Sequence, residues 1–477
     1  MILTADLGGS SLRVALLGRD GAIAAMHAVP HVLGAEADPE DWWRGFVAGV
    51  EALPAADVAR AEAVAVTAFT RSLVLLDDAG AVLRPAMLWT DARAESVVEE
   101  VRAMLPAHAE AAQVNAFHPL ARLCWLARAE PLVVARAAVA LEPKDEINRR
   151  LTGVAVSDVV SSARLAASQD LFAPLGLPDL LPPLRRPGAV MGLVREGLPG
   201  ALAALAGRPV LAMANDTWAA TTGLGAMRSG MAYCISGTTE VLGLLHDAPA
   251  RAEGLLTVDW DGLWQLGGPS MHGADAVAWV QGVVASEAPP PSPSPACGGG
   301  NVSAEEGGAG DPLPLLFLPT LAGERVPHWD PSLRGAFLGL RRDHTFANLV
   351  RAVMQGVALN NATVLWRAEA AAGRVATELR LGGGGATPDW AQLRADVLGR
   401  DVVLTDAPEP GLLGCAITAI AALDRRPLAE IQFGLARPTR RFAPDPARHA
   451  AYRELHAIFA RAEAAVAPIS RALAALG

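Results

Sequence analysis

Residues 2–17 read Ile2-Leu3-Thr4-Ala5-Asp6-Leu7-Gly8-Gly9-Ser10-Ser11-Leu12-Arg13-Val14-Ala15-Leu16-Leu17, two apolar runs separated by a turn of glycine and serine. The turn at Asp20-Gly21 leads into a further strand-like run, so residues 2–28 predict a β-meander. Glycine lets backbone N–H groups approach an anion closely, and a carboxylate beside the turn can hold Mg²⁺ through water. The candidates for phosphate and metal binding in this stretch are Asp6, Gly8, Gly9, Ser10, Ser11 and Arg13, and an ordinary surface turn is the alternative.

A second stretch repeats this design in the other half of the chain. The runs 231–235 and 241–245 predict two strands, and Gly237 of the turn between them stands 228 positions after Gly9. Two such hairpins predict an α/β chain of duplicated domains, at residues 1–224 and 225–477, which face a central cleft with one phosphate-binding turn each. The candidates in the second turn are Ser236, Gly237, Thr238 and Thr239.

The size and composition of the chain exclude several classes of protein. A chain of 477 residues is too long for one core, and its net charge of −10 argues against non-specific nucleic-acid binding. The sequence contains no run of 18 or more apolar residues, so no membrane span is predicted. The first residues lack the basic segment that begins a signal peptide. The four cysteines show neither metal-ligand spacing nor a disulfide pattern, so we expect a cytoplasmic protein.

Two common nucleotide-binding motifs are absent from the sequence. Lys144 is the only lysine, and no glycine loop precedes it, which excludes a P-loop. No Gly-x-Gly-x-x-Gly follows a strand-like run, which removes the usual dinucleotide fingerprint. A single lysine in a chain rich in arginine is consistent with a need for a compact ammonium group, and an ion pair with Asp145 or Glu146 is the structural alternative.

An acidic residue stands where an apolar run gives way to a helix-like stretch. Residues 209–213 are apolar, and Asp216 follows in Ala214-Asn215-Asp216-Thr217-Trp218. A carboxylate at a strand-to-helix junction faces the crevice where open α/β sheets bind ligands. We therefore expect Asp216 to take a proton from a substrate hydroxyl, and a helix N-cap is the alternative role.

Two further groups are candidates for ligand binding. Trp89-x-Asp91-x-Arg93 can grip a polyol, because carboxylate and guanidinium bond adjacent hydroxyls while indole packs on carbon. A helix cap and a surface ion pair are the alternative for Asp91 and Arg93. The run Gly382-Gly383-Gly384-Gly385, after a predicted strand at 378–381, lets the backbone lie against a flat adenosine. The other nucleotide candidates are Asp389 and Gly411, which begins a predicted helix.

Residues 285–312 form a segment rich in proline, serine and glycine, which cannot pack a core. An apolar run resumes at 313–319. We therefore expect a disordered surface insertion in the second domain rather than a linker between domains.

The chain resembles the FGGY family of carbohydrate kinases over nearly its whole length. The most specific evidence is Gly335-Ala336-Phe337-Leu338-Gly339-Leu340, followed after seven residues by Asn348-Leu349-Val350-Arg351-Ala352-Val353-Met354-Gln355, which fits the family's C-terminal signature. Asp6-x-Gly8-Gly9-Ser10 is similar to the first phosphate motif, with Gly9 in place of a threonine. Further matches are Trp89-x-Asp91-x-Arg93, Lys144-Asp145, Leu151-Thr152-Gly153, Asp216, Ser236-Gly237-Thr238-Thr239, Gly323-Glu324-Arg325 and the glycine run at 382.

The resemblance implies the actin-like, ribonuclease-H-like ATPase fold in two domains. It also implies ATP-dependent phosphorylation of a sugar hydroxyl with Mg²⁺, most similar to the xylulokinase members. By this resemblance Asp216 is the general base, Asp6 and Asp216 lie at the metal, and the two turns hold phosphates. A small sugar or polyol is the expected partner, with no nucleic acid and no membrane, and a homodimer is left open.

One departure from the resemblance concerns the acceptor sugar. Xylulokinases carry Gln-Met-His after the strand that corresponds to residues 61–66, where this chain has Phe69-Thr70-Arg71. Arginine cannot accept a hydrogen bond, so Thr70 and Arg71 can select a sugar substrate other than xylulose. Arg71 can pair with the carboxylate of an aldonate. We expect a pentulose kinase, with gluconate, glycerol or a four-carbon polyol as other acceptors. A non-enzymatic sugar-binding regulator is the alternative of another class.

Overall fold

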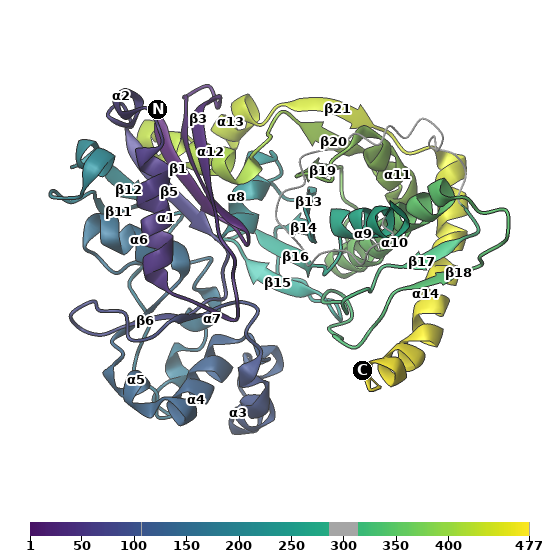
Figure 1. The fold of residues 1–477 in the computed structure, drawn as a ribbon, viewed down its shortest axis with the longest axis horizontal. Coiled ribbons are helices and arrows are strands. Elements are labelled where there is room, and N and C mark those ends of the chain that lie inside the picture. Colours follow the sequence, from purple (N-terminus) through teal and green to yellow (C-terminus); the bar gives the residue numbers. More distant parts are fainter. Residues whose placement is uncertain (106, 286–312, 477) are drawn as a thin grey trace. The chain divides into compact units, whose positions relative to one another are not determined.

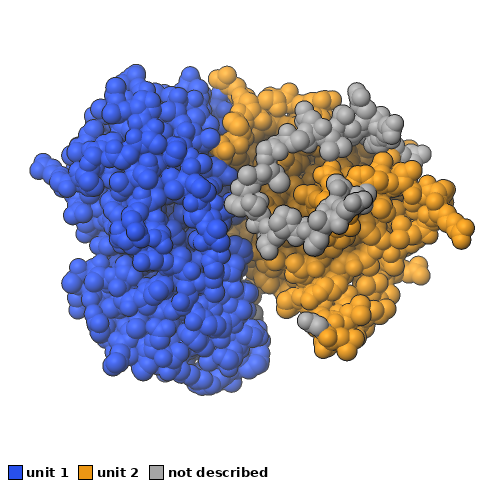
Figure 2. Space-filling model, viewed as in Figure 1, with its two compact units in different colours: residues 1–223, 411–435 blue, residues 224–410, 436–477 orange. Residues whose placement is uncertain are grey.

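The structure, a computed structural model, describes residues 1–105, 107–285 and 313–476. The chain forms two compact units: residues 1–223 with 411–435, and residues 224–410 with 436–477 (Figure 2). The return of residues 411–435 to the first unit was not anticipated by the predicted division at 224 and 225. Of the predicted insertion at 285–312, only Ala285 lies within the described residues, where it ends helix α9 (Ala274–Ala285).

The first unit is built on a six-stranded sheet in the order β11-β12-β5-β1-β2-β3 (Figure 1). Its strands are β1 (Ile2–Leu7), β2 (Ser11–Leu17), β3 (Ile23–Pro30), β5 (Ala63–Ala68), β11 (Val190–Leu193) and β12 (Pro209–Leu211). The first three strands form the predicted antiparallel meander, and β5 runs parallel to both β1 and β12. Strand β5 is buried along its whole length, which explains its continuous apolar sequence.

Helix α1 (Pro39–Glu51) shows how the local sequence sets this unit's core. Asp38 caps the helix by accepting the Glu40 N–H at 2.9 Å, and Pro39 occupies the first helical position. Trp42, Phe46 and Val50 recur at helical spacing, and all three are buried in the core that includes the sheet residues. The capped helix therefore covers one face of the sheet.

A mostly helical region of the first unit has a core of its own. It contains α3 (Val98–Met104), α4 (Pro119–Ala129), α5 (Pro131–Arg136) and α7 (Ala163–Ala166), with the antiparallel pair β6 (Val74–Leu76) and β8 (Val139–Leu141). Helix α6 (Pro143–Thr152) follows β8 and contributes Ile147 and Leu151 to the core of the sheet. Residues 1–223 also contain the short elements β4 (Glu36–Ala37), α2 (Ala55–Val58), β7 (Ala86–Met87), β9 (Ser157–Asp158), β10 (Leu184–Arg185) and α8 (Asp216–Gly223).

The second unit has a seven-stranded sheet in the order β15-β16-β14-β13-β19-β20-β21. Its strands are β13 (Ala232–Ser236), β14 (Glu240–His246), β15 (Leu256–Asp259), β16 (Trp264–Pro269), β19 (Leu379–Gly382), β20 (Val402–Thr405) and β21 (Pro438–Phe442). Helix α10 (Phe346–Ala372) begins at a capping box on Thr345, and α11 (Pro388–Leu398) and α14 (Pro446–Ala474) join it. The small hairpin of β17 (Leu316–Leu318) and β18 (Ala336–Leu338) lies beside α10 in the same core.

The two sheets share one topology. In each, an antiparallel meander is followed by two strands parallel to the first strand: β1-β2-β3 with β5 and β12, and β13-β14-β16 with β19 and β20. The predicted α/β fold with two duplicated domains of ribonuclease-H-like type is therefore confirmed. Within the described ranges, no helix combines the length and the apolar composition needed to cross a bilayer.

Candidate active site

Three parallel strands of the first unit bring candidate residues to one edge of its sheet. The register pairs Asp6 of β1 with Thr67 of β5, and the Thr67 hydroxyl donates to the Ala214 carbonyl oxygen at 2.8 Å. Arg71 follows the end of β5, and Asp216 follows the end of β12. Because the carboxyl ends of parallel strands share an edge, Asp6, Arg71 and Asp216 all belong to that edge, which is where such sheets bind ligands.

Asp216 is the first residue of α8, and Asn215 before it is the cap. The Asn215 Oδ1 atom accepts the Trp218 N–H at 2.8 Å, so capping does not occupy the Asp216 carboxylate. That carboxylate accepts from the Thr217 N–H at 2.6 Å and from the Thr217 hydroxyl at 3.2 Å. Burial raises the pKa of Asp216 to about 6, although both bonds from Thr217 lower it.

The first predicted phosphate turn is held in place by hydrogen bonds that its carbonyl oxygens accept. The Gly8 N–H donates to the Ser11 oxygen at 3.0 Å, and the His31 N–H donates to the Ser10 oxygen at 3.0 Å. Gly9 and Ser10 are exposed at the tip of the turn. On the strands, Arg13 of β2 pairs in register with Asp6 of β1.

Gly411 lies close to Asp6 within the first unit. A Cβ atom added at Gly411 would lie 2.6 Å from Asp6 Oδ2, so only glycine leaves room beside that carboxylate oxygen. Gly411 is in the first turn of α12 (Pro410–Asp424), which α13 (Leu428–Leu435) follows. The prediction of Gly411 as a nucleotide residue thus concerns a glycine beside the predicted metal-binding carboxylate.

The second predicted phosphate turn is fastened to the start of helix α9. The Ala274 N–H donates to the Gly237 oxygen at 2.9 Å, and the Asp275 N–H donates to the Thr238 oxygen at 3.3 Å. Within the turn, the Gly237 N–H donates to the Thr239 oxygen at 2.9 Å. Hydrogen bonds to its carbonyl oxygens therefore define the conformation of the turn.

A buried ion pair between Glu240 of β14 and Arg394 of α11 lies next to this turn. Arg394 is 0% exposed and Glu240 is 1% exposed, and their side chains form a salt bridge. Ser236 donates its hydroxyl to Glu240 Oε1 at 2.6 Å, and Asn361 donates to Glu240 Oε2 at 2.9 Å. The Arg394 guanidinium also stacks 4.3 Å from the centre of the Trp390 ring. This pair was not predicted from the sequence, although an acidic residue directly before the apolar run 241–245 was a detectable signal.

The glycine run packs directly on the second turn. The Gly385 N–H donates to the Ser236 oxygen at 2.9 Å, and a Cβ atom at Gly385 would lie 2.2 Å from Ser236 Oγ. Gly383 has φ of 93°, and its added Cβ would lie 2.4 Å from the Ser236 oxygen. Gly384 has open space around it, and Asp389 is exposed in the first turn of α11. The structure therefore brings the second turn and the glycine run together.

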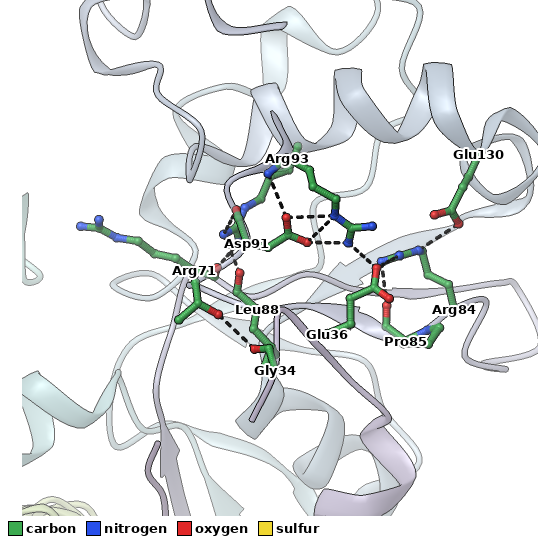
Figure 3. Close-up of polar contacts among 11 residues, drawn as sticks. Gly34, Glu36, Arg71, Arg84, Pro85, Leu88, Asp91, Arg93 and Glu130 are labelled. Carbon is green, nitrogen blue, oxygen red and sulfur yellow. Dashed lines mark hydrogen bonds and ion pairs between the residues drawn. The ribbon is translucent and has the colours of Figure 1, made fainter. Parts of the chain in front are cut away.

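The predicted sugar-binding cluster contains a closed ion-pair network (Figure 3). Asp91 is 1% exposed and accepts from the Arg93 backbone N–H and from Arg93 Nε, both at 3.0 Å. Arg93 also pairs with Glu36 and lies 4.7 Å from the Trp125 ring centre. Burial raises the pKa of Asp91, but the bonds from Arg93 outweigh it and keep that pKa below its usual value. The ion-pair alternative is thus present, and direct contact of Trp89, Asp91 or Arg93 with a sugar stays a prediction.

The single lysine pairs with Asp145, one of the two predicted structural partners, and with Asp158 in place of Glu146. Lys144 Nζ lies 2.6 Å from Asp145 Oδ1 and 2.7 Å from Asp158 Oδ2, and all three side chains are buried. Ser157 donates its hydroxyl to the other oxygen of Asp145. A compact ammonium group between two buried carboxylates joins α6 to β9, so Lys144 stabilises the first unit.

Comparison with known proteins agrees with both halves of this architecture. Residues 1–223 match the N-terminal domain, and residues 232–423 the C-terminal domain, of the FGGY family of carbohydrate kinases. The chain belongs to the FGGY family. It is 29% identical to the xylulose kinase of Klebsiella pneumoniae over 98% of this chain and 100% of that enzyme. It is 23% identical to the gluconokinase of Bacillus licheniformis over 96% of this chain and 94% of that enzyme.

The similarity extends to the three-dimensional fold. The crystal structure of a xyloylose kinase from Brucella ovis superposes with a TM-score of 0.84 at 25% identity, covering 98% of this chain and 99% of that one. As an FGGY carbohydrate kinase, the protein is a phosphotransferase that acts on an alcohol group of a sugar substrate. Members of this family use ATP with a divalent metal ion.

A cavity of about 560 Å³ in the second unit contains none of the candidate residues. Its wall includes Trp366 and Arg367 of α10, His456 and Glu463 of α14, and His328. The candidate residues therefore lie at the sheet edge and first turn of the first unit and at the second turn and glycine run of the second unit, and none lines this cavity.

Proposed function

We propose that this FGGY kinase transfers the γ-phosphoryl group of ATP, with Mg²⁺, to a hydroxyl of a pentulose. The observation that carries the proposal is Asp216, at the same sheet edge as Asp6 and relieved of capping by Asn215. A sugar hydroxyl does not ionise at neutral pH, so its proton must leave as the bond to phosphorus forms. With a pKa of about 6, Asp216 is mostly ionised at pH 7 and can accept that proton.

The remaining residues bind and orient the nucleotide in this proposal. The turns at Gly8–Ser11 and Ser236–Thr239 would offer phosphate oxygens backbone N–H groups other than those of Gly8 and Gly237, which bond within their own turns. The glycine run 383–385 gives the adenosine a surface without side chains. Phosphoryl transfer depends on positioning and charge neutralisation, so this arrangement suffices without a covalent intermediate.

The Asp6 carboxylate, with Gly411 beside it, is a suitable ligand for a hydrated Mg²⁺ ion. Gly411 places no side chain beside the Asp6 carboxylate, and Mg²⁺ prefers carboxylate oxygens while keeping several of its waters. When bound, Mg²⁺ would neutralise charge on the phosphate oxygens. Asp6 would hold the ion, and Asp216 would complete the pair of carboxylates predicted at the metal.

A second acceptor class is favoured by Arg71. Its guanidinium follows the end of β5 at the shared edge, and a guanidinium pairs with a carboxylate through two parallel hydrogen bonds. An aldonate such as gluconate would supply that carboxylate, whereas a pentulose would not. Similarity to the Klebsiella xylulose kinase supports the pentulose, and Arg71 supports the aldonate.

The deciding experiment is coupled ADP release from the full-length protein against pentuloses, polyols and aldonates. We expect one pentulose to give the highest kcat/KM, and an aldonate preference would select the second candidate. Asp57→Asn on the surface helix α2 is the matched control for Asp216→Asn in the same assay. If no acceptor stimulates ADP release from the wild type, the kinase proposal is wrong and a sugar-binding regulator is favoured.

A further inference from the structure

The backbone at Arg71 has an unusual conformation. Its φ is 64°, in the left-handed region that residues other than glycine rarely adopt. Such a conformation persists only where the surroundings fix it, and it concentrates at binding and catalytic sites. The groups that fix Arg71 therefore bear on acceptor binding.

Glu142 fixes the backbone at Arg71 from one side. Its Oε1 atom accepts the Arg71 N–H at 3.2 Å, and its Oε2 atom accepts the Ser72 N–H at 3.1 Å. Glu142 directly precedes Pro143, the first residue of α6. Two consecutive N–H groups of the turn after β5 are thereby attached to one carboxylate at a helix start.

Arg122 of α4 fixes the same turn from the other side. Its Nη1 donates to the Arg71 carbonyl oxygen, and its Nη2 donates to the carbonyl oxygens of Leu88 at 2.6 Å and Asp91 at 3.3 Å. The Arg122 side chain is 1% exposed, so these three oxygens compensate for part of the loss of its hydration, while its buried Nε has no hydrogen-bond partner among the described residues. Figure 3 shows Arg71, Leu88 and Asp91 gathered in this way from two segments of the chain.

Arg122 therefore binds both predicted acceptor segments, and Glu142 binds the one that contains Arg71. Neither side chain was among the residues predicted from the sequence. We call Arg122, Glu142 and the backbone groups they bind the Arg122/Glu142 bracket. Burial lowers the pKa of Arg122 to about 10 and raises the pKa of Glu142 to about 8, and charge on Glu142 opposes the shift at Arg122. Figure 3 also shows the Arg71 side chain extending away from the Asp91–Arg93 pair.

We propose that Arg122 and Glu142 are positioning residues for the acceptor of phosphoryl transfer. They hold Arg71 in its left-handed conformation and fix it relative to the segment 88–93, and this fixed relation sets which acceptor is phosphorylated. The proposal rests on the proposed function, because it needs an acceptor at this edge of the sheet. It adds that specificity depends on a buried arginine and a half-buried glutamate that need not touch the acceptor.

The test uses the full-length variants Arg122→Lys and Glu142→Gln. A lysine cannot reach three carbonyl oxygens with the geometry of a guanidinium, and a glutamine offers only one acceptor oxygen to two N–H groups. We expect the KM for the best acceptor to rise at least tenfold, the KM for ATP to change less than twofold, and the ranking of acceptors to shift. The control is Arg150→Lys, which alters a largely buried guanidinium of α6 that pairs with Glu146 and Glu40.

Hydrogen exchange of the segment 69–73 gives a readout that does not depend on turnover. Its amides should exchange faster in both variants and remain as in the wild type in Arg150→Lys. An unchanged acceptor KM, a parallel rise of the KM for ATP, or unchanged exchange would overturn the positioning role. A wild type that releases no ADP with any acceptor would instead overturn the proposed function, and the two failures are thus distinct. If Arg122→Lys does not fold, Glu142→Gln supplies the same comparison.

Discussion

The Oδ1 atom of Asn215 accepts the Trp218 N–H at 2.8 Å, so the residue before Asp216 caps helix α8. Two adjacent polar residues thereby divide two tasks, since one satisfies the helix terminus and the other retains a carboxylate at the sheet edge. This division makes the role of Asp216 testable without loss of the helix.

We expect Asp216→Asn to lower kcat at least a thousandfold while the protein still binds ATP. The amide cannot accept the proton of the acceptor hydroxyl, but the turns proposed to bind the nucleotide are unchanged. Steady-state kinetics and a nucleotide-binding titration measure the two effects separately. Near wild-type turnover in this variant would show that another group is the base.

The activity of the wild type should fall on the acid side of pH 6. Burial raises the pKa of Asp216 to about 6, and only its ionised form can act as a base. Below that pH, kcat/KM for the acceptor should decrease about tenfold per pH unit, a slope set by one protonation. A profile that stays flat down to pH 5 would contradict the assignment.

The same carboxylate should destabilise the folded protein at neutral and higher pH. Its pKa in the folded state lies above the ordinary value of 3.8, so ionisation costs more in the folded state than in the unfolded state. The cost is absent below the unfolded pKa and complete above about pH 6. Asp216→Asn should therefore melt at a higher temperature than the wild type at pH 8, and the difference should vanish towards pH 4. Asp57→Asn is the control, for which no such pH-dependent gain is expected.

Gly385→Ala should weaken ATP binding. Its new methyl group would lie 2.2 Å from Ser236 Oγ and would displace the glycine run from the second predicted phosphate turn. We expect the KM for ATP to rise about tenfold, which corresponds to about 1.4 kcal/mol, with little change in the KM for the acceptor. Gly282→Ala in α9, where no atom lies within 4 Å of the added Cβ, serves as the control. Equal effects of the two substitutions would disprove this packing argument.

Breaking the buried pair beneath the second turn should destabilise the second unit strongly. Arg394→Met leaves the Glu240 carboxylate buried without its cation, and such a loss costs about 3–5 kcal/mol. For a unit of this size the thermal midpoint should fall by roughly 10 °C. The double variant Glu240→Gln with Arg394→Met should regain much of that loss, because no unpaired charge remains. A double variant less stable than the single one would indicate that the pair itself is strongly stabilising.

The fold could be predicted because its decisive features are local. The hairpins around Gly9 and Gly237 place strands, turns and duplication within short stretches, and the cap at Asp38 and the capping box at Thr345 mark two helix starts. Asp216 was predicted at a strand-to-helix junction, and the structure places it there. Its catalytic role stays a prediction.

The supporting side chains could not be predicted because their partners are distant in the sequence. Arg394 is 154 residues from Glu240, and Arg122 is 51 residues from Arg71. Periodicity indicates which face of a helix is buried but not which charge it will meet. The left-handed φ of Arg71 also has no local signal, since it depends on bonds from Glu142 and Arg122.

Residues 411–435 complete the first unit only after most of the second has been made. Helix α12 approaches α8 so closely that a Cβ atom at Gly414 would lie 1.8 Å from the Ala219 oxygen, and Gln432 donates to the Thr222 oxygen at 2.8 Å. A nascent chain that has left the ribosome only as far as residue 223 lacks both contacts. The catalytic Asp216 proposed here therefore stands on a helix whose packing partners are supplied about 190 residues later, so that active kinase can form only near the end of synthesis.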